Sequence, residues 1–261
     1  MRVGAVLIAT GLALTGCGTV TTTTVEMRPR VVRTPDPIDP LALAKKLIAI
    51  QPDWPTTRKI DCKRAKCIAL TFDDGPGKYT DKLLDMLSKH RVRATFFLVG
   101  EMVEENGRHT LPRMVADGHE LGNHSWSHAQ LTALSTDGVR SELKRTQDLV
   151  ERLTGVRMRV MRPPYGSTDG RVAAETRHEK LAQILWNVDT LDWRDRVRSI
   201  VAKRACDAKP GSIVLMHDIH SSTVDAVPHI LDTLLDKGYT FVTISELYGS
   251  TPAPGRKYTE R

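Results

Sequence analysis

The sequence is poor in aromatic residues and cysteines, and its positive charges are not clustered. Aromatic side chains make up 5% of the 261 positions, and the lysines and arginines that give a net charge of +7 are scattered along the chain. A nucleic-acid interface combines a basic patch with a recognisable binding motif, so none is expected. The expected helices also lack a glycine-rich phosphate loop, which leaves a nucleotide site unsupported.

The N-terminus has the layout of an export signal. A basic residue, Arg2, precedes an apolar run that is too short to span a bilayer as a permanent helix. The run ends at Leu14-Thr15-Gly16-Cys17, which resembles a bacterial lipobox. That resemblance implies that residues 1–16 are removed and that a lipid is attached to Cys17. The alternative is a plain secretory signal with an incidental cysteine.

The segment after Cys17 is rich in threonine and proline, a composition typical of an extended tether. We therefore expect a tether with one short helix over residues 17–60, a folded domain over 61–249 and a tail over 250–261. With the lipid on Cys17, the protein is expected at the outer face of the cell membrane. No protein partner can be inferred, and a monomer is expected.

Three further cysteines bear on the fold. Cys62 and Cys67 are separated by four residues, and in an oxidising compartment they can close a small loop before the first expected strand. Cys206 is then left as a thiol, although its pairing with either of the other two remains open. A zinc knuckle is not expected, because there is no second close pair.

From Cys67 onward, strand-length apolar runs alternate with helical patterns, which predicts a parallel sheet covered by helices. The expected strands are 67–72, 94–99, 119–122, 159–162, 182–188, 212–217 and 240–243. The expected helices are 79–90, 113–117, 137–153, 170–178, 196–208 and 224–237. Seven such strands favour an α/β fold of the distorted (β/α)7 type, similar to a TIM barrel.

Unusual polar residues follow the carboxyl ends of the expected strands. They are Asp73, Asp74, His124, His128, Arg162, Asp189, Asp192 and His217. In barrels of parallel strands the active site is assembled at that end, from the termini of several strands. Each residue alone has an ordinary structural explanation, but their coincidence at one rim predicts a site.

Two adjacent acids and two spaced histidines suggest a metal at this rim. Asp73 and Asp74 repel each other at the end of a buried strand unless a cation or proton lies between them. His124 and His128 are four residues apart, which on a helical turn directs both imidazoles to one cation. Two histidines and one carboxylate leave open coordination positions, as in catalytic zinc sites. Non-haem iron uses the same ligands, so the metal stays open.

Five segments, in this order, resemble the motifs of the polysaccharide deacetylases, the NodB-homology family also called carbohydrate esterase family four. They are TFDDG, HSWSH, RPPYG, DTLDW and LMH, and the similarity covers roughly residues 67–247. The resemblance implies a divalent metal held by Asp74, His124 and His128. Zinc is the first choice, with cobalt, nickel or iron as the others.

The resemblance also implies roles for the remaining motif residues. Asp73 is expected to be the general base, with Arg162 paired to it. The backbone amide of Tyr165 is expected to stabilise the oxyanion. His217 is expected to protonate the leaving amine, with Asp192 raising its pKa. Trp193 of the motif DTLDW and Leu215 of the motif LMH are expected to line the pocket for the acetyl group and the sugar.

The expected function is removal of N-acetyl groups from a cell-wall polysaccharide by a metal-dependent hydrolase. The first candidate substrate is peptidoglycan, at N-acetylglucosamine or N-acetylmuramic acid. An O-deacetylase of the acetylxylan type and a chitin-oligosaccharide deacetylase are alternatives within the enzyme class. Outside that class, a carbohydrate-binding lipoprotein is the alternative, although an intact base, acid and ligand set argues against it.

Overall fold

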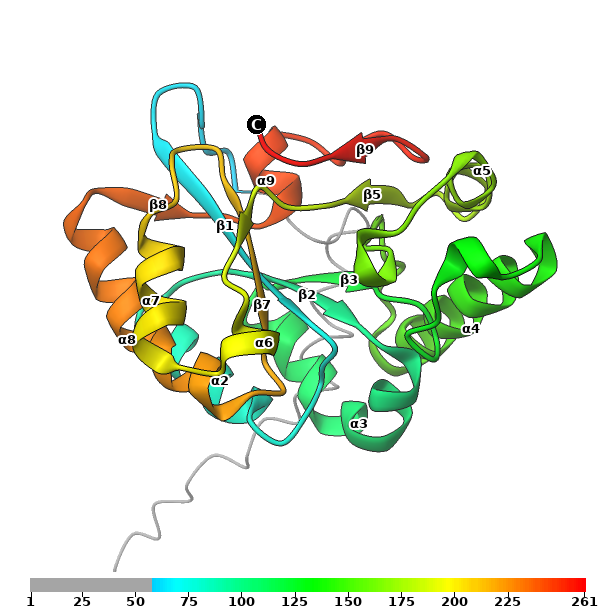
Figure 1. Cartoon of the computed structure of the whole chain (residues 1–261), viewed down its shortest axis with the longest axis horizontal. Helices are drawn as coiled ribbons and strands as arrows, with labels where there is room; N and C mark the ends of the chain where they lie inside the picture. Colours follow the sequence, from blue (N-terminus) through cyan, green and yellow to red (C-terminus); the bar gives the residue numbers. More distant parts are fainter. Residues whose placement is uncertain (1–57) are drawn as a thin grey trace, which may run out of the picture. The chain divides into compact units, whose positions relative to one another are not determined.

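The computed structural model describes residues 58–261, so the expected signal segment, Cys17 and nearly all of the expected tether lie outside the described residues. Within this range the chain forms one sheet with helices packed on it (Figure 1). No helix within residues 58–261 is long and apolar enough to cross a membrane.

Over residues 58–261 the sheet has nine strands, and all of their pairings are parallel. The strands are β1 (Lys66–Asp73), β2 (Thr95–Leu98), β3 (Glu120–Asn123), β4 (Val160–Met161), β5 (Ala182–Ile184), β6 (Val188–Asp189), β7 (Ile213–His217), β8 (Tyr239–Phe241) and β9 (Lys257–Tyr258). Their order is β6-β7-β1-β2-β3-β4-β5-β9, with β8 paired to β1. Because β5 and β6 do not pair, the sheet is a curled, open barrel, and the predicted α/β barrel class is confirmed.

In the described part of the chain, eight helices and two single 3-10 turns connect these strands. The helices are α2 (Thr80–Lys89), α3 (Gly100–Ala116), α4 (Thr136–Thr154), α5 (Gly170–His178), α6 (Asp192–Asp195), α7 (Arg198–Cys206), α8 (Ser221–Asp236) and α9 (Ile244–Tyr248). The 3-10 turns are η1 (Leu131–Ala133) and η2 (Pro164–Gly166). Helices α7 and α8 pack against each other, as do α3 and α4 (Figure 1).

The alternation of side chains in β1 determines what faces the barrel interior. Ile68, Leu70 and Phe72 pack into the large core that the outer helices share with the sheet. Cys67 and Ala69 pack into a second core inside the barrel. Since successive side chains of a strand point to opposite faces, Thr71 and Asp73 continue the inward-facing row. The last inward position of β1 is therefore a carboxylate at the open end of the barrel.

The structure corrects several expected boundaries. The helix expected at 113–117 is only the last turn of the 17-residue α3, which the helix-disfavouring Gly107 and Pro112 obscure in the sequence. The strand expected at 182–188 is broken into β5 and β6. Helices α6 and α9 were not expected. The predicted tail, 250–261, is wrong as a separate element, because its strand β9 pairs with β5.

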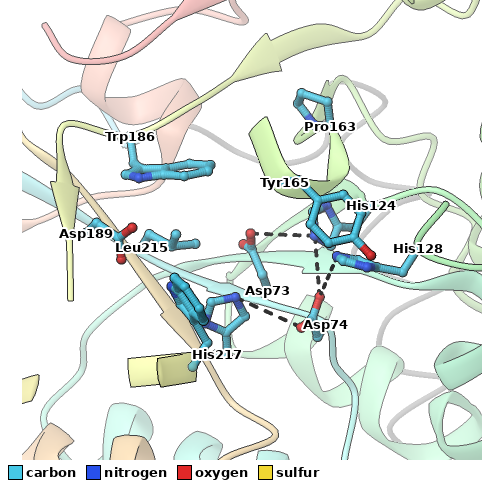
Figure 2. A pocket seen from close by; sticks show the side chains of 11 residues that line it. Asp73, Asp74, His124, His128, Pro163, Tyr165, Trp186, Asp189, Leu215 and His217 are labelled. Atoms are coloured by element: carbon cyan, nitrogen blue, oxygen red, sulfur yellow. Dashed lines mark ion pairs between the residues drawn. The ribbon is translucent and has the colours of Figure 1, made fainter. Parts of the chain in front are cut away.

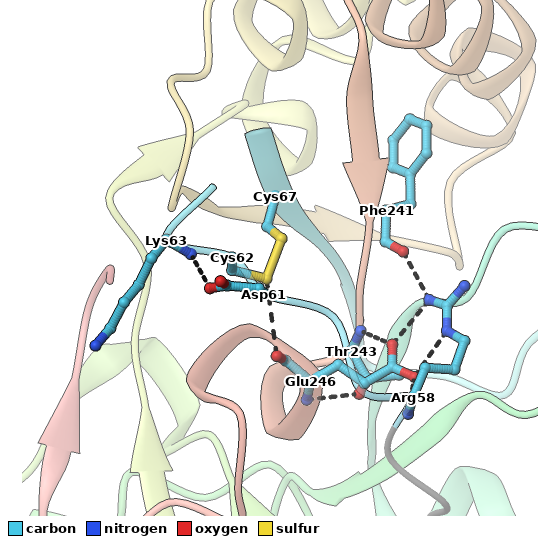
Figure 3. Close-up of a disulfide and its surroundings, with 8 residues drawn as sticks. All are labelled: Arg58, Asp61, Cys62, Lys63, Cys67, Phe241, Thr243 and Glu246. Carbon is cyan, nitrogen blue, oxygen red and sulfur yellow. Dashed lines mark hydrogen bonds and ion pairs between the residues drawn. A yellow bond between two sulfur atoms is a disulfide. The ribbon is translucent and has the colours of Figure 1, made fainter. Parts of the chain in front are cut away.

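Residues at the start of the described chain are tied to the amino end of the barrel. Arg58 donates hydrogen bonds from its backbone N–H, Nε and Nη2 to the buried carboxylate of Glu246 in α9. Glu246 and Thr243 also form a capping box at the start of that helix. The folded domain thus begins before residue 61, since Arg58 already belongs to it (Figure 3).

A disulfide joins Cys62 to Cys67 at the entry of β1, with a Cα–Cα distance of 5.4 Å (Figure 3). Cys206 is a buried free thiol. We expect the double variant Cys62→Ser/Cys67→Ser to lose at most about 2–3 kcal/mol of unfolding free energy, because the closed loop is short. Denaturant unfolding of both proteins measures this loss. Mass mapping of the unreduced protein should find the same bridge, and a peptide linked through Cys206 would contradict it.

Candidate active site

The carboxyl ends of the strands surround a cavity of about 510 Å³ (Figure 2). Its walls carry charged, imidazole and aromatic side chains from five separate segments of the chain. They are Asp73, Asp74, His124, His128, Pro163, Tyr165, Trp186, Asp189, Trp193, Leu215 and His217. The cavity therefore collects residues of all five sequence motifs.

Strand register places the two principal proton-transfer candidates beside each other. Asp73 of β1 pairs with His217 of β7, and Thr71 pairs with Leu215 two positions earlier. Residues paired across adjacent parallel strands point to the same face, so these four side chains are directed inward. Asp73 and His217 consequently meet at the rim from neighbouring strands.

Asp74, His124 and His128 form a cluster suited to a metal ion. Their candidate ligand atoms all lie within 4.8 Å of one another. The Nε2 atoms of both histidines are 3.4 Å from Asp74 Oδ1. That oxygen is buried and has no hydrogen-bond partner among the described residues, a costly arrangement for a carboxylate unless a cation binds there.

The protonation states of the cluster also suit a metal. His124 Nδ1 lies 2.6 Å from the carbonyl oxygen of Arg162; a carbonyl can only accept, so Nδ1 carries the proton and Nε2 presents its lone pair to the cluster. Burial lowers the pKa of His128, and the charge of His124, when that ring is protonated, lowers it further, so the neutral form of His128 is favoured. Burial opposes ionisation of Asp74, but its close contact with His124 and the positive charge that His124, His217 and His128 can carry hold its pKa below the usual range.

The segment His124–His128 is not the helical turn that the spacing of its histidines suggests. It is an irregular loop, in which Ser125 has φ 66° and His128 has φ 57°. The prediction of a helix was therefore wrong, although the imidazoles do converge. Eight described non-glycine residues have positive φ, and five of them lie in the five motifs: Asp74, Ser125, His128, Tyr165 and Leu191. Such strained backbone clusters at functional sites.

Asp73 is held by a buried arginine. Arg162 Nη1 donates to Asp73 Oδ1 at 2.7 Å and to Thr71 Oγ1 at 2.8 Å. The guanidinium is fully buried and lies over the rings of Phe97 and Trp186. Burial lowers the pKa of Arg162, while the charge of Asp73 and their hydrogen bond oppose that decrease. One carboxylate oxygen of Asp73 is thus fixed, and the other lies 3.7 Å from His124 Nε2.

His217 is paired with Asp192, which lies behind the cavity wall. The ring Nδ1 lies 2.8 Å from Asp192 Oδ1, and the His217 backbone N–H donates to Oδ2 at 2.7 Å. Thr223 Oγ1 donates to the same Oδ2 at 2.7 Å. Burial would lower the pKa of His217, but the hydrogen bond and charge of Asp192, followed by Asp73 and Asp74, raise it to about 9. The Nε2 atom of His217 lies 4.0 Å from Asp74 Oδ2.

Aromatic side chains form the mouth of the cavity. Tyr165 and Trp193 are 69% and 48% exposed, which is unusual for large apolar side chains and leaves their faces available to a ligand. The Tyr165 ring contacts the edge of His128, and Leu215 is buried in the cavity wall. Trp186 also lines the cavity and was missed from the sequence, where it stands just outside the fourth motif.

All the site residues that the sequence singled out are brought together. Nine of them, Asp189 included, line the cavity, and Arg162 and Asp192 lie behind it in contact with Asp73 and His217. Metal-dependent hydrolases combine a metal site of three protein ligands with a general base and a general acid. The arrangement in this cavity, with a buried partner beside Asp73 and another beside His217, is typical of that class.

Comparison with known proteins agrees with that class. The family model described as polysaccharide deacetylase matches residues 60–184. A solved structure described as "T48 deacetylase with substrate" is 43% identical, with a TM-score of 0.73 over 76% of this chain and 99% of that one. The chain belongs to the polysaccharide deacetylase family, carbohydrate esterase family four, whose members are metal-dependent.

Two curated relatives have more specific names. The peptidoglycan-N-acetylglucosamine deacetylase PgdA of Listeria monocytogenes is 44% identical over 201 residues, which are 76% of this chain and 42% of the relative. The peptidoglycan-N-acetylmuramic acid deacetylase PdaC of Bacillus subtilis is 41% identical over 184 residues, 70% of this chain and 38% of the relative. The chain thus spans less than half the length of each of these relatives.

Proposed function

We propose that the protein hydrolyses the N-acetyl groups of peptidoglycan and releases acetate and a free amino sugar. The observation that carries the proposal is the placement of Asp73 and His217 on paired strands, beside the ligand cluster Asp74, His124 and His128. The names of the two relatives, which act on different peptidoglycan sugars, support the polymer and leave both sugars as candidates.

A divalent metal, zinc as first choice, is assigned to Asp74, His124 and His128. When bound, such an ion polarises the acetyl carbonyl and lowers the pKa of water. The unpartnered Asp74 Oδ1 and the Nε2 atoms of both histidines, each 3.4 Å from it, fit this assignment. Cobalt, nickel and iron accept the same nitrogen and oxygen ligands, so the donor set alone does not select zinc.

The chain's own residues supply the proton transfers. Asp73, oriented by Arg162, accepts a proton from the attacking water as the bond from oxygen to the acetyl carbon forms. The backbone N–H of Tyr165 donates to the oxyanion that develops on the former carbonyl oxygen. His217, protonated through its pairing with Asp192, gives its proton to the sugar nitrogen as the C–N bond breaks.

The rim residues select and orient the glycan. Trp193, with its exposed ring, provides a face on which a sugar can stack, and Leu215 provides an apolar wall for the acetyl methyl group. An ester at the same position is an easier substrate, so O-deacetylation of xylan is the alternative within this chemistry. A carbohydrate-binding protein without catalysis would not need the buried pairs Asp73–Arg162 and Asp192–His217.

The experiment is to incubate the purified protein, loaded with zinc, separately with cell-wall peptidoglycan, chitin oligomers and acetylated xylan, and to measure released acetate. We expect the fastest release from peptidoglycan, with new free amines on its glycan strand. Faster release from xylan would replace the proposal with an O-deacetylase. Binding to the polymers without any acetate release would replace it with the binding protein.

We also propose that the protein acts in the cell envelope, attached through a lipid on Cys17. The variant Cys17→Ser is expected to leave the membrane fraction while its acetate release stays unchanged, because the site lies entirely within the folded domain. Immunoblots of membrane and soluble fractions measure the distribution. An unaltered membrane fraction for the variant would rule out the anchor.

A further inference from the structure

The loop that carries both histidines of the cluster holds a conformation that it does not prefer by itself. Ser125 and His128 have φ values of 66° and 57°, in the left-handed region that non-glycine residues rarely adopt. Each such residue carries a conformational cost and persists only when its surroundings over-determine it. The two Nε2 atoms point at one Asp74 oxygen because of this conformation, so the contacts that impose it control the geometry of the cluster.

The carbonyl side of the loop is fixed by α3. The N–H groups of Gly100 and Glu101, in the first turn of that helix, donate to the carbonyls of Ser125 and Trp126, each at 3.0 Å. The ring of Trp126 lies against Gly100, where a Cβ atom would come within 2.4 Å of it. Helix α3 thus binds the carbonyl groups of the loop. The backbone N–H groups of Trp126 and Ser127 need another partner.

That partner is the side chain of Glu142 in α4. Its Oε2 accepts from the N–H groups of Trp126 at 2.9 Å and Ser127 at 2.8 Å. Its Oε1 accepts from the Ser127 hydroxyl at 3.0 Å. Among residues 58–261, the hydrogen bonds of the Glu142 carboxylate all go to this loop. A carboxylate that accepts from several backbone donors makes strong, charge-assisted bonds.

We propose that Glu142 is a positioning residue that sets the metal affinity of the site by holding the loop between His124 and His128. Its three bonds offset the cost of the left-handed residues. Without them water satisfies the freed N–H groups, and the loop gains conformations in which the imidazoles no longer converge. Glu142 touches neither histidine ring nor the cavity, so it is not assigned a part in the chemical step. This inference rests on the ligand cluster assigned under the proposed function.

The test is calorimetric titration of zinc into the metal-free protein, compared among variants. Glu142→Ala is expected to bind zinc about 10- to 100-fold more weakly, the range seen when groups that orient metal ligands are removed. Glu142→Gln keeps one oxygen for both N–H groups, so it is expected to restore most of the affinity. Ser127→Ala loses one of the three hydrogen bonds to the Glu142 carboxylate, the one made by an exposed hydroxyl, and should weaken binding by about 2- to 10-fold.

Glu151→Ala is the matched control. Glu151 is on the same helix α4 and is likewise part-buried, and its carboxylate pairs with Arg157 at 2.9 Å, away from the loop. Its removal should leave the zinc affinity unchanged. The rate of acetate release at saturating zinc should be within about twofold of wild type for every variant, whereas the zinc concentration for half-maximal rate should follow the calorimetric series.

The outcomes separate a failure of the role given to Glu142 from a failure of the metal site itself. Unchanged zinc affinity in a folded Glu142→Ala would overturn the inference, as would a lower rate at saturating zinc with unchanged affinity. If Glu142→Ala does not fold by circular dichroism, Glu142→Gln and Ser127→Ala carry the test, and wild-type affinity in both would overturn it. Failure of the wild-type protein itself to bind zinc or another divalent ion would instead refute the metal site of the proposed function.

Discussion

Asp73→Asn is expected to reduce acetate release by about 100-fold to 10,000-fold without weakening metal binding. The amide has the shape of the carboxylate and keeps an oxygen that can accept from Arg162, so the buried guanidinium retains this hydrogen bond. It cannot accept a proton from water, however, and the reaction loses its base. Because the loss has this cause, added zinc should not restore the rate.

Asp74→Asn gives the contrasting result. A neutral amide is a poorer ligand for a divalent ion than a carboxylate, and Asp74 Oδ1 lies 3.4 Å from the Nε2 atoms of both cluster histidines. This variant should lose metal and recover part of its rate when zinc is added.

Elemental analysis and acetate release are to be measured on both proteins. A metal-free Asp73→Asn together with a metal-replete Asp74→Asn would mean that the two adjacent carboxylates have exchanged roles.

The sequence is informative about the site because the site residues lie at the ends of strands. The apolar run before Asp73 predicts a buried strand, and parallel strands bring their carboxyl ends to one rim. Strand and helix order therefore suffices to predict that Asp73, His124, Arg162 and His217 are neighbours. The register between Asp73 and His217 follows from sheet pairing, which no local pattern specifies.

The local conformation of the motif loops could not be predicted in the same way. The spacing of His124 and His128 fits a helical turn, but α3 and α4 impose left-handed residues on the segment between them. Glu142 gives no sequence signal for this role, since it is 14 residues beyond His128 on an amphipathic helix where an acidic residue is ordinary. Tertiary contacts, rather than propensity, decide such segments.

The missed helix α9 is a different case, because its signal is present in the sequence. Thr243 and Glu246 are spaced as a capping box, and the structure shows both of its hydrogen bonds. Its length of five residues hides it from any search for helical periodicity. Strand β9, with two residues, is equally short and is stabilised by pairing with β5.

The pairing of His217 with Asp192 determines how the rate should depend on pH. Burial alone would favour the neutral imidazole, but the hydrogen bond and charge of Asp192 raise the pKa of His217 to about 9. The imidazolium, the form that can protonate a leaving amine, is therefore present at neutral pH. The rate of the wild-type protein should fall as the pH rises through the pKa of His217, because the acid is then lost.

Asp192→Asn removes the carboxylate that raises this pKa and should move the falling, basic limb of the pH–rate profile to lower pH. At pH 8 the variant is expected to be about 100-fold to 10,000-fold slower than wild type, since its imidazole is then mostly neutral, and part of this loss should be recovered at lower pH. Thr223→Val is the control: it removes one hydrogen bond to Asp192 but keeps the charge beside His217, so its basic limb should stay close to that of wild type. The profiles are measured as kcat/KM for acetate release across the basic range. A profile of Asp192→Asn that is lower at every pH but unshifted would show that Asp192 orients His217 without controlling its protonation.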